Sequence, residues 1–108
     1  MKQNSVQLIG YVGSDPVIKT LANGVKRATI RVATHYKLRK EEVGKTYGTT
    51  WHQVVAWDKN AENAERSFVK GSHILVSGSI SYRTYSDRDS HTHYITEISA
   101  EELINLDR

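Results

Sequence analysis

A seven-residue stretch in the middle of the chain, from Trp51 to Trp57, limits the possible fold more than any other feature. Its sequence, WHQVVAW, is rich in aromatic and β-branched residues and is typical of a strand. Successive side chains of a strand point to opposite faces, so both indoles fall on one face together with Gln53 and Val55. That face is expected to be either a wall of the core or an exposed platform on which flat ligands stack.

Alternating runs on the N-terminal side of this stretch predict further strands. Residues 6–12 alternate, and their glycine is typical of the bends by which a small barrel curls on itself. A second extended region is interrupted by Asn23-Gly24, a dipeptide that strongly indicates a hairpin turn. In the run 27–36 after this turn, aliphatic side chains share one face, whereas Arg27 and Arg31 share the other.

The segments on both sides of the tryptophan strand predict a flap before it, and one helix and two strands after it. Residues 37–50, on its N-terminal side, are charged and are interpreted as a long hairpin or flap. After it, Asp58 is a suitable N-cap for a short helix that Gly71 is expected to end. Two more strands are predicted over 72–85 and 94–99. The last apolar residues fit either a final strand or a turn of helix.

The order of these elements predicts the fold class. Strands with a single helix between the third and the fourth are typical of the OB-fold, an all-β, five-stranded and partly open Greek-key barrel. At 108 residues, the chain is expected to form one such domain over 1–108. Alternation along the fourth strand places Ile80 and Tyr82 on its inner side and Tyr85 on its outer side.

The distribution of charge favours a polyanionic partner. The chain has 15 basic and 12 acidic residues, for a net charge of +3. Seven of the basic residues lie between positions 26 and 45, whereas acidic residues dominate from position 97 onward. This separation is typical of a polyanion-binding face, and a solvated charged hairpin is the alternative.

No motif of the sequence supports catalysis, a cofactor or a metal. Cysteine is absent, which excludes disulfides, thiolate nucleophiles and cysteine-based zinc sites. His91 and His93 have no third ligand at a suitable spacing and are interpreted as loop histidines. The chain shows neither a signal peptide nor an apolar run of membrane-spanning length, so we expect a cytoplasmic, nucleoid-associated protein without membrane contact.

Several short motifs at fixed distances connect the chain with a known family. They are Leu8-Ile9-Gly10, Asp15-Pro16, Thr50-Trp51-His52 with Val54-Val55, Lys70-Gly71-Ser72, and Arg83-Thr84-Tyr85 followed by Asp87. With these motifs the chain resembles bacterial single-stranded DNA-binding proteins over nearly all its length. The tryptophan block, with Lys-Gly-Ser at this distance, is the specific part of the resemblance.

The resemblance implies roles for individual residues. It implies that Trp51 and Trp57 stack on bases, that Tyr85 replaces a stacking tryptophan, and that Tyr36 substitutes for an aromatic residue that aligns near Leu38. It also implies a homo-oligomer, typically a tetramer, with His52 at a contact between subunits; Val6 and Leu8 are assigned to the same interface. The acidic tail by which relatives recruit replication enzymes is missing after Arg108, so such recruitment is not expected.

A protein that binds single strands of any sequence needs aromatic faces for the bases and cations for the phosphates. The aromatic candidates are Trp51, Trp57, Tyr85, Tyr36, Tyr47 and Tyr82. The basic candidates are Arg27, Arg31, Lys37, Arg39, Lys40, Lys45, Arg83 and Arg88. The predicted function is sequence-independent binding and protection of single-stranded DNA in replication, recombination and repair. Two alternatives are a primosomal OB-fold protein that binds single strands as a dimer, and a structural OB module for protein or sugar.

Overall fold

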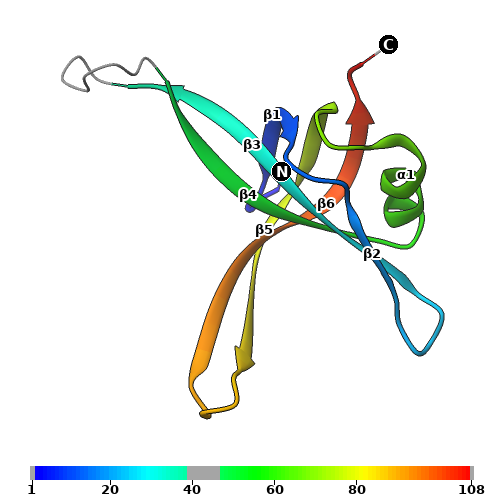
Figure 1. The fold of residues 1–108 in the computed structure, drawn as a ribbon, viewed down its shortest axis with the longest axis vertical. Coiled ribbons are helices and arrows are strands. Elements are labelled where there is room, and N and C mark those ends of the chain that lie inside the picture. The colour runs from blue at the N-terminus through cyan, green and yellow to red at the C-terminus, as the bar shows by residue number, and fades with distance from the viewer. Residues whose placement is uncertain (1, 39–46, 108) are drawn as a thin grey trace.

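A computed structural model describes residues 2–38 and 47–107 of the protein (Figure 1). Its elements, in chain order, are β1 (Val6–Val12), β2 (Val17–Thr20), β3 (Lys26–Lys37), β4 (Tyr47–Trp57), α1 (Lys59–Ser67), β5 (His73–Ser86) and β6 (Thr92–Asn105). Among the described residues, no helix combines the length and the apolar character that crossing a membrane requires.

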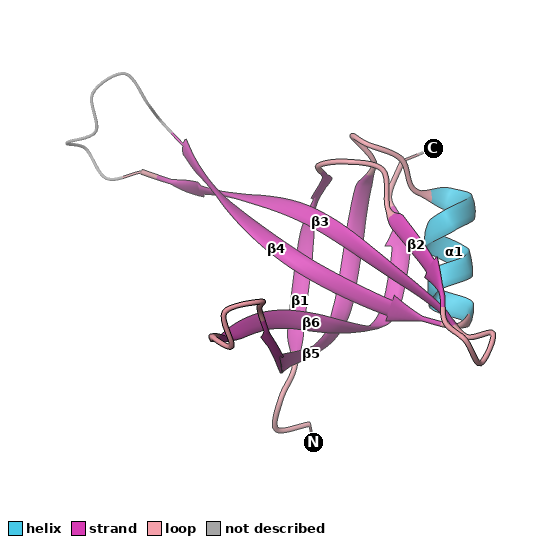
Figure 2. Cartoon of the chain, turned by 60° about the horizontal axis from the view of Figure 1, so that its bottom comes forward, coloured by secondary structure: helices cyan, strands magenta, loops and turns pink. Residues whose placement is uncertain are grey.

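The strands form a small barrel with α1 at one end (Figure 2). They form one sheet in the order β1-β5-β6-β4-β3-β2, and β1 also pairs with β3, which closes a barrel of five strands. Two of the junctions are short, with the residue pairs Tyr11–Ala33 and Val12–Val32 between β1 and β3, and Val54–Ile98 and Val55–Ser99 between β4 and β6. The expectation of a five-stranded OB-fold barrel is therefore confirmed.

Alternating side chains of the strands fill the core. From β3, β4 and β5, the side chains of Ile30, Val54 and Ile74 are fully buried, and Ala64 of α1 and Phe68 just beyond it pack against them. Even-numbered positions of β3 and β4 therefore face inward. As a result, Arg27, Arg31, Trp51 and Trp57, at odd-numbered positions, face outward.

The turn at Asn23-Gly24 connects β2 and β3 as a hairpin, as its sequence predicts. The backbone nitrogen of Gly24 donates to the Leu21 oxygen, and that of Leu21 donates to the Val25 oxygen. Gly24 has a φ of 85°, a left-handed conformation that glycine adopts at little cost. The single extended region of the sequence is thus two strands, of which β2 lies outside the barrel closure.

Two long hairpins extend beyond the barrel (Figures 1 and 2). Strands β3 and β4 stay paired out to Lys37 and Tyr47, so the N-terminal part of β4, expected in a flap, is strand. Strands β5 and β6 form the second hairpin, here called the β5–β6 arm. The inward placement of Ile80 and Tyr82 is wrong, because they are 39% and 74% exposed where β5 leaves the barrel. Of the last apolar residues, undecided from the sequence, Leu103 and Ile104 belong to β6, whereas Leu106 follows its end.

The predicted start of the helix is correct, but its predicted end is wrong. Asp58 is the N-cap residue of α1, and its backbone oxygen accepts from the Glu62 nitrogen, although its side chain makes no capping hydrogen bond. The helix ends at Ser67, four residues before Gly71. With a φ of 92°, Gly71 lies in the turn that leads into β5, and its nitrogen donates to the Val12 oxygen.

Candidate nucleic-acid interface

The two tryptophans lie on an open face of β3 and β4. Direct pairing places Trp57 opposite Arg27 and Trp51 opposite Ala33, on one face of the hairpin. Trp51 is 50% exposed and Trp57 is 41% exposed. Of the two alternatives for this face, the structure has the exposed platform rather than the core wall.

Arginines lie close to both indoles. The Cζ atom of Arg31 is 4.5 Å from the centroid of the Trp51 ring, and that of Arg27 is 6.0 Å from the centroid of Trp57. A guanidinium over an indole is attracted by the negative charge of the ring face. Each tryptophan of this face therefore has a positive charge close to its ring.

Gly13, just after β1, lies directly under the Trp51 ring. A Cβ atom at this position would be 2.3 Å from a carbon of the six-membered ring, far inside van der Waals contact. The Gly13 nitrogen donates to the Arg31 oxygen at 2.9 Å, which fixes this backbone beside β3. The close approach of the indole therefore favours glycine at this position.

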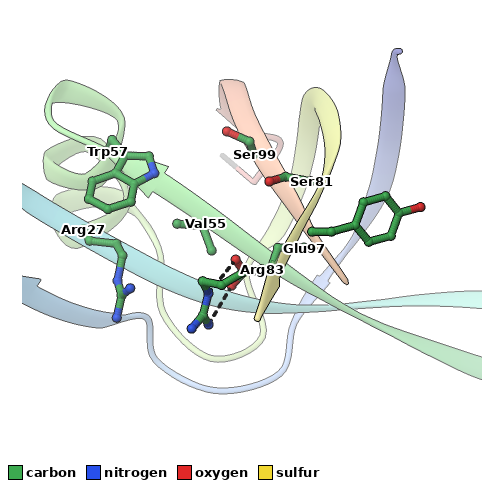
Figure 3. Close-up of a pocket in the computed structure, with 8 residues that line it drawn as sticks. Arg27, Val55, Trp57, Ser81, Arg83, Glu97 and Ser99 are labelled. Carbon is green, nitrogen blue, oxygen red and sulfur yellow. Dashed lines mark hydrogen bonds and ion pairs between the residues drawn. The ribbon is translucent and has the colours of Figure 1, made fainter. Parts of the chain in front are cut away.

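A buried carboxylate connects β4 with the β5–β6 arm. Glu97 on β6 accepts a hydrogen bond from Gln53 at 2.8 Å. It also accepts two from the Arg83 guanidinium, at 3.1 and 3.2 Å (Figure 3). The hydrogen bonds from Arg83 hold the pKa of Glu97 below its ordinary value, so the pair is charged at neutral pH. Arg83 is therefore paired with a carboxylate, and this ion pair connects the two strands of the β5–β6 arm. The sequence did not single out Glu97, because its partners are far away along the chain.

A cleft opens beside this ion pair. It has a volume of about 320 Å³, and Trp57, Arg27, Arg83, Ser81 and Ser99 are among the residues that line it (Figure 3). Tyr82, Val55 and Glu97 complete the lining, so that two aromatic residues, two arginines and the carboxylate paired with Arg83 converge between the barrel and the arm. Such a combination suits a nucleotide, which has a flat base and a charged phosphate.

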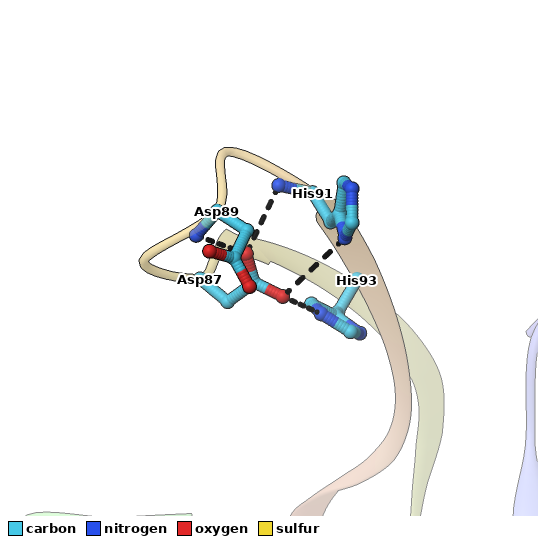
Figure 4. A network of polar contacts seen from close by, with 4 residues as sticks. All are labelled: Asp87, Asp89, His91 and His93. Carbon is cyan, nitrogen blue, oxygen red and sulfur yellow. Dashed lines mark hydrogen bonds and ion pairs between the residues drawn. The ribbon is translucent and has the colours of Figure 1, made fainter.

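At the tip of the arm, Tyr85 is one half of a stacked pair. Its ring lies 4.9 Å from that of His93, with an interplanar angle of 16°. Nε2 of His93 is 2.6 Å from Oδ2 of Asp87, and Oδ1 of Asp87 accepts from the backbone nitrogens of Asp89 and His91 (Figure 4). The hydrogen bond with His93 is the main cause that lowers the pKa of Asp87. His93 covers one face of the Tyr85 ring, and Tyr85 is 46% exposed.

The remaining candidates are distributed over several surfaces. Register places Tyr47 on the face of Trp51, whereas Tyr36 falls on the opposite face of its hairpin, over Gly48. Tyr82 alternates with Arg83 along β5, yet it lines the cleft beside Trp57 and Arg83. Lys37, opposite Tyr47, and Arg88, near the tip of the arm, are exposed, whereas Arg39, Lys40 and Lys45 lie outside the described residues.

His52, the residue assigned to a subunit contact, lines a cavity that Trp51 and Glu97 also line. His52 is half-buried, and its Nε2 is 2.8 Å from Oγ1 of Thr34. Burial lowers the pKa of His52. With Val6 and Leu8, it lines a second cavity of about 300 Å³. The three residues assigned to the interface are thus neighbours in space. In the part of the chain that the structure describes, no three metal-ligating side chains are placed to hold a metal ion.

The fold and the platform together define an OB-fold protein with an open face of aromatic and cationic side chains. The model of the single-strand binding protein family matches residues 3–106, and the chain belongs to this family. It is a family of binding proteins rather than enzymes.

Individual relatives agree with this assignment. "Single-stranded DNA-binding protein 1" of Xylella fastidiosa (strain 9a5c) is 37% identical over 101 residues, which are 93% of this chain and 74% of the relative. The "Single-stranded DNA-binding protein" of strain Temecula1 is 39% identical over 101 residues, and the match spans 61% of its length. The solved complex of Plasmodium falciparum SSB with ssDNA superposes with a TM-score of 0.85 at 36% identity, and the match covers 99% of this chain and 97% of that one.

Proposed function

We propose that the protein binds single-stranded DNA regardless of sequence and protects it during replication, recombination and repair. The observation that carries the proposal is the exposure of both indoles on one face with an arginine beside each. Every base has a flat face, so stacking on aromatic rings is tolerant of sequence. The family and the relatives named above support the same conclusion. In bacteria this role belongs to the cytoplasm, where the protein would associate with the nucleoid.

Each part of the platform has a role in this proposal. Trp51 and Trp57 stack on bases, Arg31 and Arg27 neutralise the neighbouring phosphates, and Tyr85 adds a platform on the arm. Because these rings come from both hairpins, the relative placement of β4 and the arm matters for a strand that contacts both. The hydrogen bonds of Glu97 to Gln53 and Arg83 support that placement.

The test of this function is a titration with poly(dT) monitored by tryptophan fluorescence. We expect strong quenching at low salt, because bases would stack directly on the exposed indoles. Repeated at increasing salt, log affinity should fall linearly with log salt at a slope near −0.7 per neutralised phosphate. Unchanged emission at low salt would contradict the proposal and favour a structural OB module.

The proposal includes a homo-oligomer, with a tetramer as its expected state. Two features support self-association. The residues assigned to the interface, His52, Val6 and Leu8, border one cavity at the surface. In addition, positions 6–10 of β1 pair with β5 on one side, and their other edge has no partner strand within the described residues. An open strand edge is a template for pairing with another chain.

His52 is expected to make self-association and stability sensitive to pH. Burial lowers its pKa in the folded protein below the ordinary 6.5, so the folded state binds this proton more weakly than the unfolded chain. The contribution of neutral His52 to the free energy of unfolding is therefore complete above pH 6.5, and it is lost as the pH falls from 6.5 through the folded-state pKa of His52. Urea unfolding and sedimentation velocity at pH 7.5 and 5.5 would measure it. The His52→Gln variant should lack this component, and an identical pH response in both proteins would refute the assignment.

A further inference from the structure

A row of side chains continues the Trp51 platform across the barrel closure. Strand pairing places His73 of β5 opposite Tyr11 of β1, Tyr11 opposite Ala33 of β3, and Ala33 opposite Trp51 of β4. Directly opposed residues of neighbouring antiparallel strands share one face of the sheet. The row therefore leads from Trp51 over β3 and β1 to β5, in the direction away from Trp57.

Tyr11 presents an aromatic surface in this row. Its ring stacks on the imidazole of His73 at a centroid distance of 4.7 Å and an interplanar angle of 16°. A second imidazole, that of His35 on β3, lies 6.3 Å away and is tilted by 41°. Tyr11 is nevertheless 46% exposed. His73 supports the ring from one side, and a substantial part of its surface stays open to a flat ligand.

A single small residue separates Trp51 from Tyr11 in this row. The residue between them, Ala33, has only a methyl group and is 6% exposed. Two strand spacings separate the two aromatic positions, which is about 10 Å. Gly13, two residues after Tyr11, carries the Trp51 ring, so both aromatic surfaces rest on the same end of β1.

We propose that a bound single strand continues past Trp51 across β1 and stacks a further base on Tyr11, with His73 as the support of that ring. This inference rests on the proposed function and extends it. Arg31, over Trp51, and His35, beside Tyr11, provide cationic or hydrogen-bonding groups along the way. The Asp107 carboxylate, which accepts from the His73 backbone nitrogen, repels phosphates and ends the path at β5.

Another occupant of this face is a second copy of the chain. Ile9 and Leu75 pair in the row next to Tyr11, and Ile9 is 55% exposed. The stacked rings and the continuity with the tryptophan platform favour nucleic acid at Tyr11. A copy of the chain is therefore an outcome of the test that would overturn the inference.

The test compares Tyr11→Ala, Tyr11→Phe and wild type with oligo(dT) of increasing length at constant salt. With long oligonucleotides, we expect Tyr11→Ala to bind about tenfold more weakly than wild type, because one stacking platform is lost. Tyr11→Phe keeps the ring and should bind like wild type. Tyr94→Ala is the matched control, because Tyr94 is 79% exposed and lies on the face of the arm opposite Glu97.

Three results would overturn the inference. Tyr11→Ala binds long oligonucleotides as tightly as wild type, Tyr11→Phe is as weak as Tyr11→Ala, or Tyr11→Ala sediments with a smaller mass than wild type. The last result would assign the face to a second copy. If wild type itself shows no quenching of tryptophan by poly(dT), the proposed function fails; if quenching is normal and Tyr11→Ala has no effect, only the extension fails.

Discussion

Replacement of Trp51 by alanine should weaken binding of single-stranded DNA by about 1–3 kcal/mol, which is roughly 5- to 150-fold. The expected loss for Trp57→Ala is of the same order, since that indole is similarly exposed and also has an arginine nearby. The double variant should lose more than either single one. Isothermal titration with oligo(dT) at one fixed salt concentration measures these differences.

The controls separate stacking from folding and from charge. Both indoles are about half exposed, so the urea midpoint of each alanine variant should stay close to that of wild type. Trp51→Phe keeps an aromatic face and should recover part of the affinity. The slope of log affinity against log salt should change little, because no cation is removed. An alanine variant with wild-type affinity would show that the base does not stack on that ring.

The alternation of side chains was the most informative property of the sequence. Burial on one face imposes a period of two, so the sequence separated the aliphatic face of β3 from its arginine face; for β4 it defined the two faces but not which of them is buried. The same period could not show where a strand leaves the barrel. Ile80 and Tyr82 have the correct parity for the inside, but β5 at that point pairs with β6 in the free arm. The end of a barrel wall depends on pairing between distant strands.

The C-terminal end of the helix was predicted wrongly, and the capping by Asp58 only in part, for a related reason. Asp58 is the type of residue that caps a helix, yet its backbone has a φ of 54°, and its side chain makes no capping hydrogen bond. Gly71 has the left-handed conformation expected of a glycine that ends a helix, but it uses this conformation in the turn before β5. The residue type indicates which backbone conformation is favoured at a position, but whether that conformation ends a helix or forms a turn depends on the surrounding chain.

The sequence predicted those features of the candidate site that depend on the spacing of residues within a single strand. The shared face of Trp51 and Trp57 follows from their spacing alone. Charge was less informative, because a count of basic residues cannot show which of them already have an acidic partner. Arg83 and Glu97 are fourteen residues apart and meet across β5 and β6. Glu97 therefore looked like part of an acidic C-terminal region, although it lies in the middle of the platform.

Gly13 offers a way to displace the Trp51 indole without altering the indole itself. In Gly13→Ala, the new methyl group would meet the ring at 2.3 Å, so the ring must move. The atom in the way belongs to a side chain with rotational freedom, and Gly13 has no positive φ, so the fold should tolerate the change. We expect affinity for oligo(dT) to fall by about tenfold, within the range for loss of one stacked base, with little change in the urea midpoint.

Gly48→Ala is the matched variant for this experiment. Its methyl group would displace the Tyr36 ring from 2.4 Å in the same manner, but Tyr36 lies on the face of the hairpin opposite Trp51. If bases stack on the tryptophan face, Gly13→Ala weakens binding and Gly48→Ala does not. Equal losses would mean that DNA also follows the Tyr36 face. Full affinity in Gly13→Ala would contradict this prediction. It would show that binding of a base does not require the Trp51 ring to lie against Gly13.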